Sequence, residues 1–347
     1  MRIIIRTSHG DSAVRTQRSL KKYFVAALMT LGLSIMGNPT PSAMAEVGPN
    51  GENGGFTAKF IAVNGVRTRY YDEGTGEPMV LVHGSGFSGT ASANTWAPNI
   101  AGFAEEFHVY APDKLASGMT GNPASDEELN IRGELQHLYD FITALGLDRI
   151  QLVGQSRGGG LAFLFTVAHP EVVRTLVIVD SATASPPAGD VRPHRRQRLF
   201  AGCAPLPEGF KCQQSALYFD PSPVSDDFVD AAAFMKDQPK ARETERRNTE
   251  SVRRRNSVMT SEMNHEAYHR ILTEGILQMP ILLYWAQNDP SVLPMQAYSF
   301  FNILAETNPY ARLLFTNRGG HFHYREQPEE FVHNVTSFVD FWRAQGR

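Results

Sequence analysis

Short apolar runs separated by helix-like segments constrain the fold of this chain more than any other feature of its sequence. Each run has the length of a strand, and helix-like or loop sequence follows it; the runs lie at residues 79–82, 108–111, 150–153, 174–179, 281–286 and 312–315. Such alternation favours a mostly parallel sheet with helices on both faces. Before it, Asn64-Gly65 separates two alternating runs and predicts a hairpin. The expected fold class is therefore α/β, with an antiparallel edge.

The first 45 residues have the composition of an export signal rather than of a folded domain. Six basic residues and one acidic residue open the segment, an apolar stretch runs from Phe24 to Met36, and Ala43-Met44-Ala45 follows. This order is typical of a cleavable signal peptide. The apolar stretch is shorter than the about 20 residues that a membrane anchor needs. We expect cleavage near Ala45, a periplasmic or secreted protein, and no stable membrane anchor.

The charge and the cysteines of the remaining chain limit the kinds of partner and cofactor that it is expected to bind. Residues 46–347 carry 27 basic and 35 acidic residues, a net charge of −8, which argues against nucleic acid as a partner. The two cysteines, Cys203 and Cys212, are expected to form a disulfide in an exported protein, and two buried free thiols are the alternative. Neither has the histidine or cysteine neighbours of a metal site. No motif calls for a metal, nucleotide or flavin, so no cofactor is expected.

The distribution of strands and helices predicts the domain organisation. Residues 46–55 are rich in glycine and asparagine and predict a flexible lead-in. The α/β core takes residues 56–184 and 276–347. Between these parts, residues 185–275 hold many prolines, both cysteines and helix-like runs around 226–236 and 241–263. We interpret this segment as a mainly helical cap that lies over the active edge of the sheet.

A candidate nucleophile lies in the segment Gly154-Gln155-Ser156-Arg157-Gly158, between an apolar run and a helix-like run. A G-x-S-x-G turn of this kind holds its serine at the top of a sheet. Asp289 and His321 each follow a later strand, which places them at the same sheet edge as Ser156. The chain order serine, aspartate, histidine is one of the known orders of a catalytic triad.

Each of these residues has a defined expected role. His321 would act as general base toward Ser156 and then as acid toward the leaving group, while Asp289 would orient His321. The negative charge that develops on the substrate needs fixed N–H donors. The backbone N–H of Arg157 is one candidate, and the loop at Ser85 supplies the other.

Other residues compete for these roles. His323 stands two residues after His321, and Asp180 also ends a strand and is the alternative acid. We interpret His83 as a structural residue that binds loop backbone, and Asp113 as a turn residue.

Four segments together resemble the α/β-hydrolase superfamily over nearly all of residues 56–345: His83-Gly84-Ser85-Gly86, Gly154 to Gly159, Asn288-Asp289 and Gly320-His321-Phe322. The glycine-rich loop that leads to Asn94 and Trp96, and the tail Glu326–Phe331, are similar to the meta-cleavage-product hydrolases. Those enzymes cleave carbon–carbon bonds in dienoates derived from aromatic rings. The resemblance implies an α/β-hydrolase fold with a cap, and a substrate site lined by Gly84, Gly86, Asn94, Gln155 and Phe322.

Three departures from that group favour a different substrate. Gln155 stands where the group usually has asparagine, and Phe322 stands where it often has tryptophan. The group also binds the keto-acid end of its substrate with a cap arginine, whereas residues Ala231–Ala233 align near that place. Ring catabolism of this kind is, moreover, normally cytoplasmic. We therefore predict an exported hydrolase of carboxylic esters that works through an acyl-enzyme.

Two other functions are weighed against this prediction. One is carbon–carbon hydrolysis of meta-cleavage dienoates, and the other is a non-catalytic protein of the same fold that binds a ligand under its cap. In each case the expected partner is a small molecule with an apolar or aromatic part, which aromatic cap residues would contact, although the same rings could simply hold the cap together. These residues are Phe200, Phe210, Tyr218, Phe219, Phe228 and Phe234. A homo-oligomer is left open.

Overall fold

The computed structural model describes residues 47–187, 198–206 and 208–347, so the export signal expected at residues 1–45 lies outside the described residues. The strands are β1 (Lys59–Val63), β2 (Val66–Glu73), β3 (Glu77–Val82), β4 (Phe107–Pro112), β5 (Ile150–Gln155), β6 (Val173–Val179), β7 (Ile281–Ala286) and β8 (Ala311–Thr316). The helices are η1 (Ala93–Trp96), α1 (Ala97–Phe103), η2 (Asp126–Glu128), α2 (Ile131–Ala144), α3 (Arg157–Ala168), α5 (Phe210–Ser215), α6 (Asp226–Lys236), α7 (Pro239–Arg247), α8 (Glu250–Glu274), α9 (Pro294–Ala305), α10 (His323–Glu326) and α11 (Pro328–Arg343).

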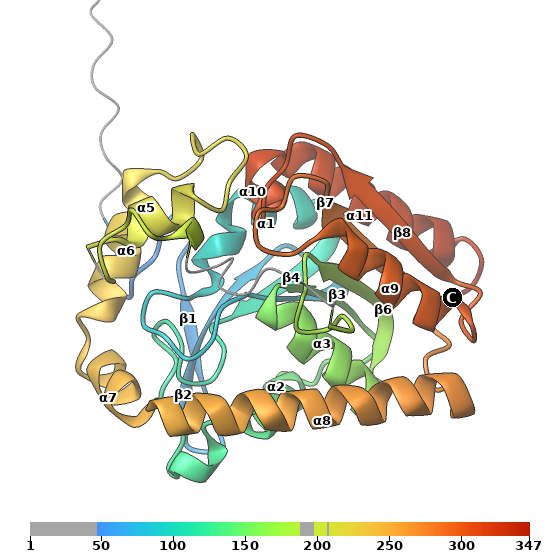
Figure 1. Ribbon diagram of the computed structural model, residues 1–347, viewed down its shortest axis with the longest axis horizontal. Helices are drawn as coiled ribbons and strands as arrows, with labels where there is room; N and C mark the ends of the chain where they lie inside the picture. Colours follow the sequence, from blue (N-terminus) through green and yellow to red (C-terminus); the bar gives the residue numbers. More distant parts are fainter. Residues whose placement is uncertain (1–46, 188–197, 207) are drawn as a thin grey trace, which may run out of the picture. The chain divides into compact units, whose positions relative to one another are not determined.

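The strands form one eight-stranded sheet in the order β1-β2-β4-β3-β5-β6-β7-β8 (Figure 1). Strands β3 to β8 pair in parallel, while β1 pairs with β2, and β2 with β4, in antiparallel fashion. Asn64 and Gly65 connect β1 to β2 with φ angles of 46° and 83°, as the two-residue turn of a hairpin requires. The predicted α/β class and its antiparallel edge are both confirmed.

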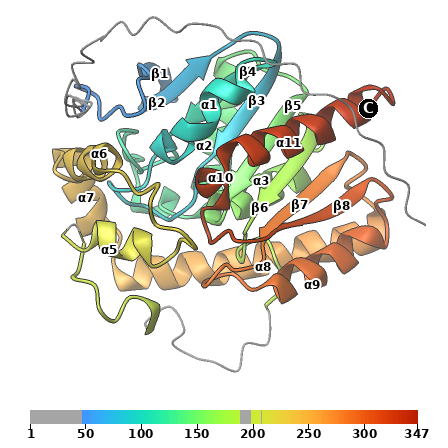
Figure 2. The same cartoon turned by 90° about the horizontal axis from the view of Figure 1, so that it is seen from above.

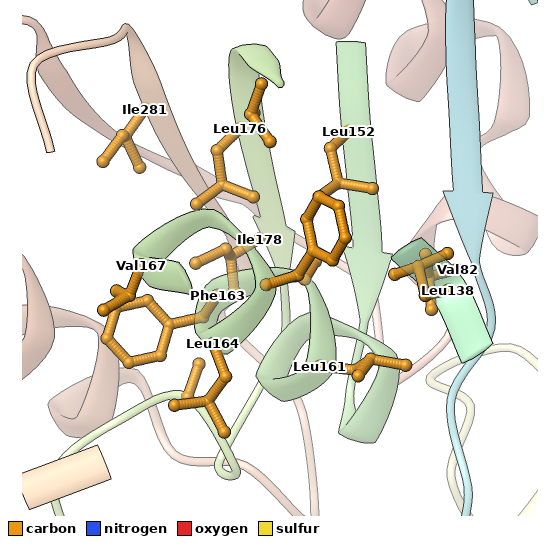
Figure 3. Packing of buried hydrophobic residues seen from close by; sticks show 14 of the residues in the cluster. Val82, Leu138, Leu152, Leu161, Phe163, Leu164, Val167, Leu176, Ile178 and Ile281 are labelled. Atoms are coloured by element: carbon orange, nitrogen blue, oxygen red, sulfur yellow. The ribbon is translucent and has the colours of Figure 1, made fainter. Parts of the chain in front are cut away.

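Alternate side chains of the central strands enter two separate hydrophobic cores. On β5, Leu152 belongs to the core that α3 covers, whereas Val153 belongs to the core on the opposite face. On β6, Ile178 joins Leu152, and Val177 joins Val153. Figure 3 shows the first of these cores, with Phe163 and its neighbours on α3 lying against β5 and β6. A strand buried on both faces has an almost continuous apolar sequence, which explains why these runs could be recognised as strands.

Two groups of helices cover these cores (Figure 2). Helices α2, α3, α8 and α9 contribute to the core on one face of the sheet, and α1 and α11 contribute to the core on the other. The loops after β3, β5 and β8 meet at one cavity, which Ser85, Ser156 and His321 line. The loops that hold the predicted site residues therefore share one edge of the sheet.

The predicted cap is smaller than residues 185–275. Helices α5, α6 and α7 lie near the active edge, and α6 begins and ends where the sequence pattern predicted a helical run. Helix α8, however, returns along the sheet, and its residues Ala267, Tyr268 and Ile271 are part of the main core. Its second half thus belongs to the α/β layer, because an apolar face at helical spacing packs on whichever surface lies opposite.

Cys203 and Cys212 form a disulfide in the first part of the cap. The bond closes a loop that ends within α5.

The lead-in expected to be flexible is instead packed, over the part that the structure describes. Glu52 and Asn53 are buried. The carbonyl of Gly51 accepts hydrogen bonds from the side chains of Arg69 and Asn94. Glycine-rich composition indicated freedom, but these polar contacts from distant residues hold the segment against the core.

Candidate active site

Ser156 occupies a strained turn between β5 and α3. Its φ and ψ angles are 52° and −121°, a region that costs a residue with a side chain about 1–3 kcal/mol. The turn is closely packed: a Cβ atom on Gly154 would lie 2.4 Å from the carbonyl oxygen of Gly158, and one on Gly158 would lie 2.4 Å from the carbonyl oxygens of Val82 and His83. Both glycines are therefore required for the strand and the helix to approach at this angle.

The three predicted triad residues form one hydrogen-bonded chain. His321 Nε2 lies 3.0 Å from Ser156 Oγ, and His321 Nδ1 lies 2.7 Å from Asp289 Oδ2. Both Asp289 and His321 are buried, whereas Ser156 is partly exposed. This arrangement lets the imidazole take the serine proton while the carboxylate stabilises the resulting positive charge.

Asp289 is itself held in place by its own loop. Its Oδ1 atom accepts hydrogen bonds from the N–H of Ser291 at 2.6 Å, the hydroxyl of Ser291 at 2.8 Å and the N–H of Val292 at 2.9 Å. Oδ1 is thereby occupied, and Oδ2 is directed at His321.

Gln155 lies beside the histidine rather than acting only as a lining residue. Its amide Nε2 donates to the carbonyl of His321 at 3.1 Å and lies 3.2 Å from His321 Nε2. The same side chain lies close to Gly84, because a Cβ there would lie 2.3 Å from Gln155 Oε1. The amide thus bridges the His321 loop and the glycine-rich loop after β3.

The expected donors for a developing negative charge lie around Ser156. The N–H of Arg157 is in the first turn of α3, where no intrahelical acceptor is available. Ser85 adopts a φ of 63° in the loop after β3. Its carbonyl accepts a hydrogen bond of 2.8 Å from Lys114 Nζ, which also donates to Glu134 at 2.9 Å.

His83 and Asp113 both have structural surroundings. His83 Nε2 accepts from the N–H of Lys114, and its Nδ1 lies 2.8 Å from the Gly84 carbonyl, as expected for a residue that binds loop backbone. Asp113 was interpreted as a turn residue, and that was incomplete. It is fully buried and forms an ion pair with Arg69 at 3.1 Å.

The competing residues, Asp180 and His323, form a pair of their own below the triad. His323 Nε2 lies 3.2 Å from Asp180 Oδ2, and Asp180 Oδ1 accepts from the N–H of Ala286. Burial lowers the pKa of His323 to about 4. Burial, followed by the nearby Asp289 charge, raises the pKa of Asp180 well above its usual range. Both pKa shifts favour the uncharged forms of Asp180 and His323. It is His321, and not His323, that contacts Ser156 and Asp289.

A cavity of about 860 Å³ opens over Ser156 between the sheet edge and the cap. Most predicted site residues line it: Gly84, Ser85, Gly86, Gln155, Ser156, Arg157, His321 and Phe322. Arg157 and Arg253 also carry positive charge into its wall, and none of the described residues that line it is an aspartate or glutamate. A site with this charge favours an anionic ligand.

Residues just before and within α8 also form part of this wall. Asn248, immediately before α8, and Arg253 and Asn256 within it line the cavity. Arg253 Nη1 donates to the carbonyl of Asn248 at 2.5 Å. In the sequence Arg253 is one of several arginines between residues 242 and 255, and only the course of α8 beside the cavity distinguishes it from its neighbours.

Asn94 does not line the cavity, contrary to what the resemblance implied. Its side chain is 1% exposed. Its Oδ1 accepts from Arg69 and from the hydroxyl of Tyr71, and its Nδ2 donates to the carbonyl of Gly51. The polar atoms of the amide are thus satisfied within the protein.

The cap aromatics divide between cavity and packing. Phe200, Phe210 and Phe228 line the cavity. Tyr218 packs on Phe322 with ring centroids 5.1 Å apart, and Phe219 is 48% exposed. An apolar part of a ligand would therefore meet three rings of the cap.

Among the described residues, no group of three or more histidine, cysteine, aspartate or glutamate side chains is arranged to hold a metal ion. Within the same residues, every helix is too short or too polar to cross a bilayer.

Comparison with known proteins finds relatives that are named as hydrolases of a dienoic acid and of a semialdehyde. The chain is 27% identical over 288 residues to 2-hydroxy-6-oxo-6-(2'-aminophenyl)hexa-2,4-dienoic acid hydrolase of Metapseudomonas resinovorans, which covers 82% of this chain and 91% of that protein. It is 38% identical over 136 residues to 2-hydroxymuconate semialdehyde hydrolase of Pseudomonas sp. (strain CF600), covering 39% of this chain and 47% of that protein.

Solved structures agree with the observed fold. A variant of the meta-cleavage product hydrolase CumD superposes with a TM-score of 0.65 at 25% identity, covering 81% of this chain and 97% of that one. The serine hydrolase CarC, involved in carbazole degradation, gives a TM-score of 0.61 at 25% identity, covering 82% and 99%. The sequence pattern of the Alpha/beta hydrolase family matches residues 79–334. Together with the eight-stranded sheet and its inserted helices, this match shows that the chain belongs to the α/β-hydrolase family and is a hydrolase.

Proposed function

We propose that this protein is a serine hydrolase that cleaves a carbon–carbon bond next to a carbonyl group in an anionic dienoate of the meta-cleavage type. One observation carries the proposal: the Ser156–His321–Asp289 chain faces a cavity whose charged lining, among the described residues, consists of arginines. The relative from Metapseudomonas resinovorans, named as a dienoic acid hydrolase, supports the same substrate class.

The chemistry follows from the positions of the three side chains. Ser156 Oγ attacks the carbonyl carbon as His321 takes its proton. The dienol has first moved its hydroxyl proton to the chain carbon next to the attacked carbonyl, so that the leaving fragment is a conjugated keto acid. The carbon–carbon bond then breaks, its electron pair is taken up by that keto acid as a dienolate, and His321 returns the serine proton to that fragment. Water, activated by His321, releases the acid from the acyl-enzyme. The donors around Arg157 and Ser85 stabilise the negative oxygen of each tetrahedral intermediate.

The arginines change the argument that favoured an ester substrate. One ground for predicting an ester substrate was the lack of an arginine near Ala231–Ala233. In the structure Arg253 of α8 and Arg157 of α3 line the cavity, so positive charge is available from other elements. The comparisons favour the carbon–carbon substrate over the ester, and ester hydrolysis becomes the competing arm of the test.

The test compares substrates on one enzyme. We would measure kcat/KM of the purified protein for a phenyl-substituted meta-cleavage dienoate and for a series of neutral aryl esters, with Ser156→Ala as the inactive control. The expected result is a preference for the dienoate of at least about 100-fold, equivalent to about 2.7 kcal/mol of transition-state stabilisation. A preference for the esters that Ser156→Ala abolishes would replace this proposal with an esterase.

The neighbouring Arg254 provides a matched control for a test of Arg253. Arg253→Met is expected to raise KM for the dienoate by about tenfold, because a charged partner of the carboxylate is lost, and to leave the neutral esters unchanged. Arg254 is the neighbouring residue on α8, is exposed and does not line the cavity. Arg254→Met should therefore behave as the unchanged protein; equal effects of both variants would exclude a carboxylate contact at Arg253.

We also propose that the protein is exported and that its signal segment is removed near Ala45. The basic opening, the apolar stretch and the Ala43-Met44-Ala45 site support this proposal. N-terminal sequencing of the protein recovered from the periplasm and the medium tests it. An intact Met1 end in the cytoplasmic fraction alone would contradict it.

A further inference from the structure

We infer that Glu326 is a positioning residue that couples the seating of the cap to the placement of the catalytic base His321. This inference rests on the proposed serine hydrolase activity. It goes further by assigning a role to a residue outside the triad.

The carboxylate of Glu326 joins two segments that are about 100 residues apart in the chain. Its Oε1 accepts a hydrogen bond of 2.7 Å from the N–H of Gly320, the residue before His321. Its Oε2 accepts bonds of 3.0 and 2.8 Å from the N–H groups of Phe219 and Asp220 in the cap. We call Glu326, Gly320, Phe219 and Asp220 the cap latch.

A second contact ties the same two segments together. The N–H of His321 donates to the carbonyl of Leu217 at 2.8 Å. The two backbones are so close that a Cβ on Gly320 would lie 2.4 Å from that carbonyl oxygen. The backbone that places His321 is therefore bonded directly to the cap, before any side chain is considered.

The helix that carries Glu326, α10, makes a further contact with the cap. On α10, the guanidinium of Arg325 lies 4.0 Å from the ring centre of Phe228, a cavity-lining residue of the cap. Glu326 itself is only partly exposed, and burial is the largest cause that raises the pKa of its carboxyl. A partly buried carboxylate that accepts three backbone N–H groups is a strong, directional link.

The consequence concerns the distance between base and nucleophile. His321 Nε2 lies 3.0 Å from Ser156 Oγ while the cap latch is formed. If the cap moves away, the N–H of His321 loses the carbonyl of Leu217 as its acceptor. Glu326, which also binds the N–H of Gly320, then loses its bonds to Phe219 and Asp220. A displacement of about 1 Å in a catalytic group is enough to lower a rate by about 100-fold. The cap latch thus makes the base competent when the cap is seated.

The test uses covalent labelling of Ser156 by a fluorophosphonate, which needs the nucleophile and its base but no particular substrate. The second-order labelling rate would be measured for the full-length protein, for Glu326→Gln and for Glu329→Gln. Glu329 carries the same charge, is exposed and lies three residues further along the chain. We expect Glu326→Gln to label about 10- to 100-fold more slowly and Glu329→Gln to label at the unchanged rate.

The pH dependence of labelling separates positioning from a loss of folded protein. The labelling rate at each pH is divided by the folded fraction measured at that pH by circular dichroism, so a loss of folded protein cannot move the midpoint. A displaced His321 loses part of its contact with Asp289, which stabilises the protonated ring, so the midpoint of the rate profile should move to lower pH. Asp289, Asp180 and His323 are ionisable groups near His321, and these variants keep all three. Glu326 is a further charge near His321, so the profile of Glu326→Asp, which keeps the carboxylate, distinguishes a displaced ring from the loss of that charge.

Each outcome decides the inference. A Glu326→Gln protein that labels like Glu329→Gln overturns it, as does a slower rate with an unmoved midpoint. If Glu326→Gln fails to fold, Glu326→Asp takes its place, because it keeps the charge but is too short to reach Gly320 and the cap together. Slow labelling with a moved midpoint then supports the inference, and the rate of the unchanged protein overturns it. Failure of the dienoate assay with rapid labelling of the unchanged protein would reject the proposed substrate and leave the cap latch standing.

Discussion

Lys114 shows how a single buried side chain shapes the candidate site. Its ammonium group donates to the carbonyl of Ser85 and to the carboxylate of Glu134, and the side chains of Lys114 and Glu134 are buried. Ser85 has a positive φ, so its loop needs an external contact to keep that backbone conformation. The ion pair therefore has a positioning role beside any contribution to stability.

Two variants separate those contributions. Lys114→Met leaves Glu134 as an unpaired buried charge and should lower the free energy of unfolding by about 3–5 kcal/mol. The double variant Lys114→Met with Glu134→Leu removes both charges and should recover most of that stability. Both proteins should keep a kcat reduced by about tenfold or more, because the Ser85 carbonyl has lost its donor. Urea denaturation and steady-state kinetics check this; full recovery of kcat in the double variant would show that Lys114 does not position the loop.

The turn between β5 and α3 shows how the packing of secondary-structure elements places the nucleophile. Ser156 is placed by the angle at which α3 leaves the strand, and that angle depends on the close approach of Gly158 to the end of β3. The neighbouring backbone belongs to the glycine-rich loop that carries Ser85. One contact thus sets the separation between the nucleophile and its predicted donors.

Substitution of Gly158 tests this close approach. In Gly158→Ala the new methyl group would lie 2.4 Å from two backbone carbonyl oxygens, so α3 and β3 must move apart. We expect a loss of about 1–3 kcal/mol in the free energy of unfolding and labelling of Ser156 slowed by at least about tenfold. Gly202→Ala is the control, because nothing lies within 4 Å of a Cβ there and the residue is exposed. Equal behaviour of the two variants would contradict the required close approach.

Over the whole molecule, buried histidines make stability depend on pH. Burial lowers the pKa of His137 to about 4, and its Nε2 lies 2.9 Å from the hydroxyl of Thr68. His323 has a pKa of about 4 for the same reason. In the unfolded chain both histidines titrate near pH 6.5. Between pH 6.5 and 4 the unfolded state therefore binds more protons, and the folded state loses stability as the pH falls.

His137→Gln isolates one of these contributions. The free energy of unfolding of the unchanged protein should fall between pH 6.5 and 4, and the part due to His137 should amount to about 2–3 kcal/mol at the acid end. The variant should lose that part of the slope. His265→Gln, at an exposed position on α8, should keep the full slope. Parallel curves for the unchanged protein and His137→Gln would contradict the assignment.

Much of the fold was predictable because its signals are local. The solid apolar runs mark strands buried on both faces, as Leu152 and Val153 show by entering different cores. Asn64-Gly65 marks the hairpin through its own backbone preference. The chain order of Ser156, Asp289 and His321 could be read for a similar reason, since parallel strands bring their carboxyl ends to one edge. Their catalytic role remains a prediction that the labelling and kinetic tests address.

The residues that escaped prediction are those whose environment is made by distant parts of the chain. Asn94 is taken out of the substrate space by Arg69, Tyr71 and Gly51, and nothing near it in sequence indicates those partners. Arg253 looks like its neighbours along α8 until the helix passes the cavity. Its charge is what shifts the proposed substrate from an ester to an anionic dienoate.

The sequence by itself thus indicated the strands, the nucleophile turn and the order of the triad, because each of these signals lies within a strand, a turn or a loop. The pairing of Cys203 with Cys212 was one of two alternatives, and the structure shows the bond. The tertiary structure alone decided the positive cavity wall, the packing of the lead-in and the bonds from Glu326 to the cap. The last two features arise where segments that are distant in the chain satisfy one another's hydrogen bonds, 43 residues apart for Gly51 and Asn94 and 107 residues apart for Phe219 and Glu326. A buried polar group takes its partner from whichever segment the packed cores bring near it.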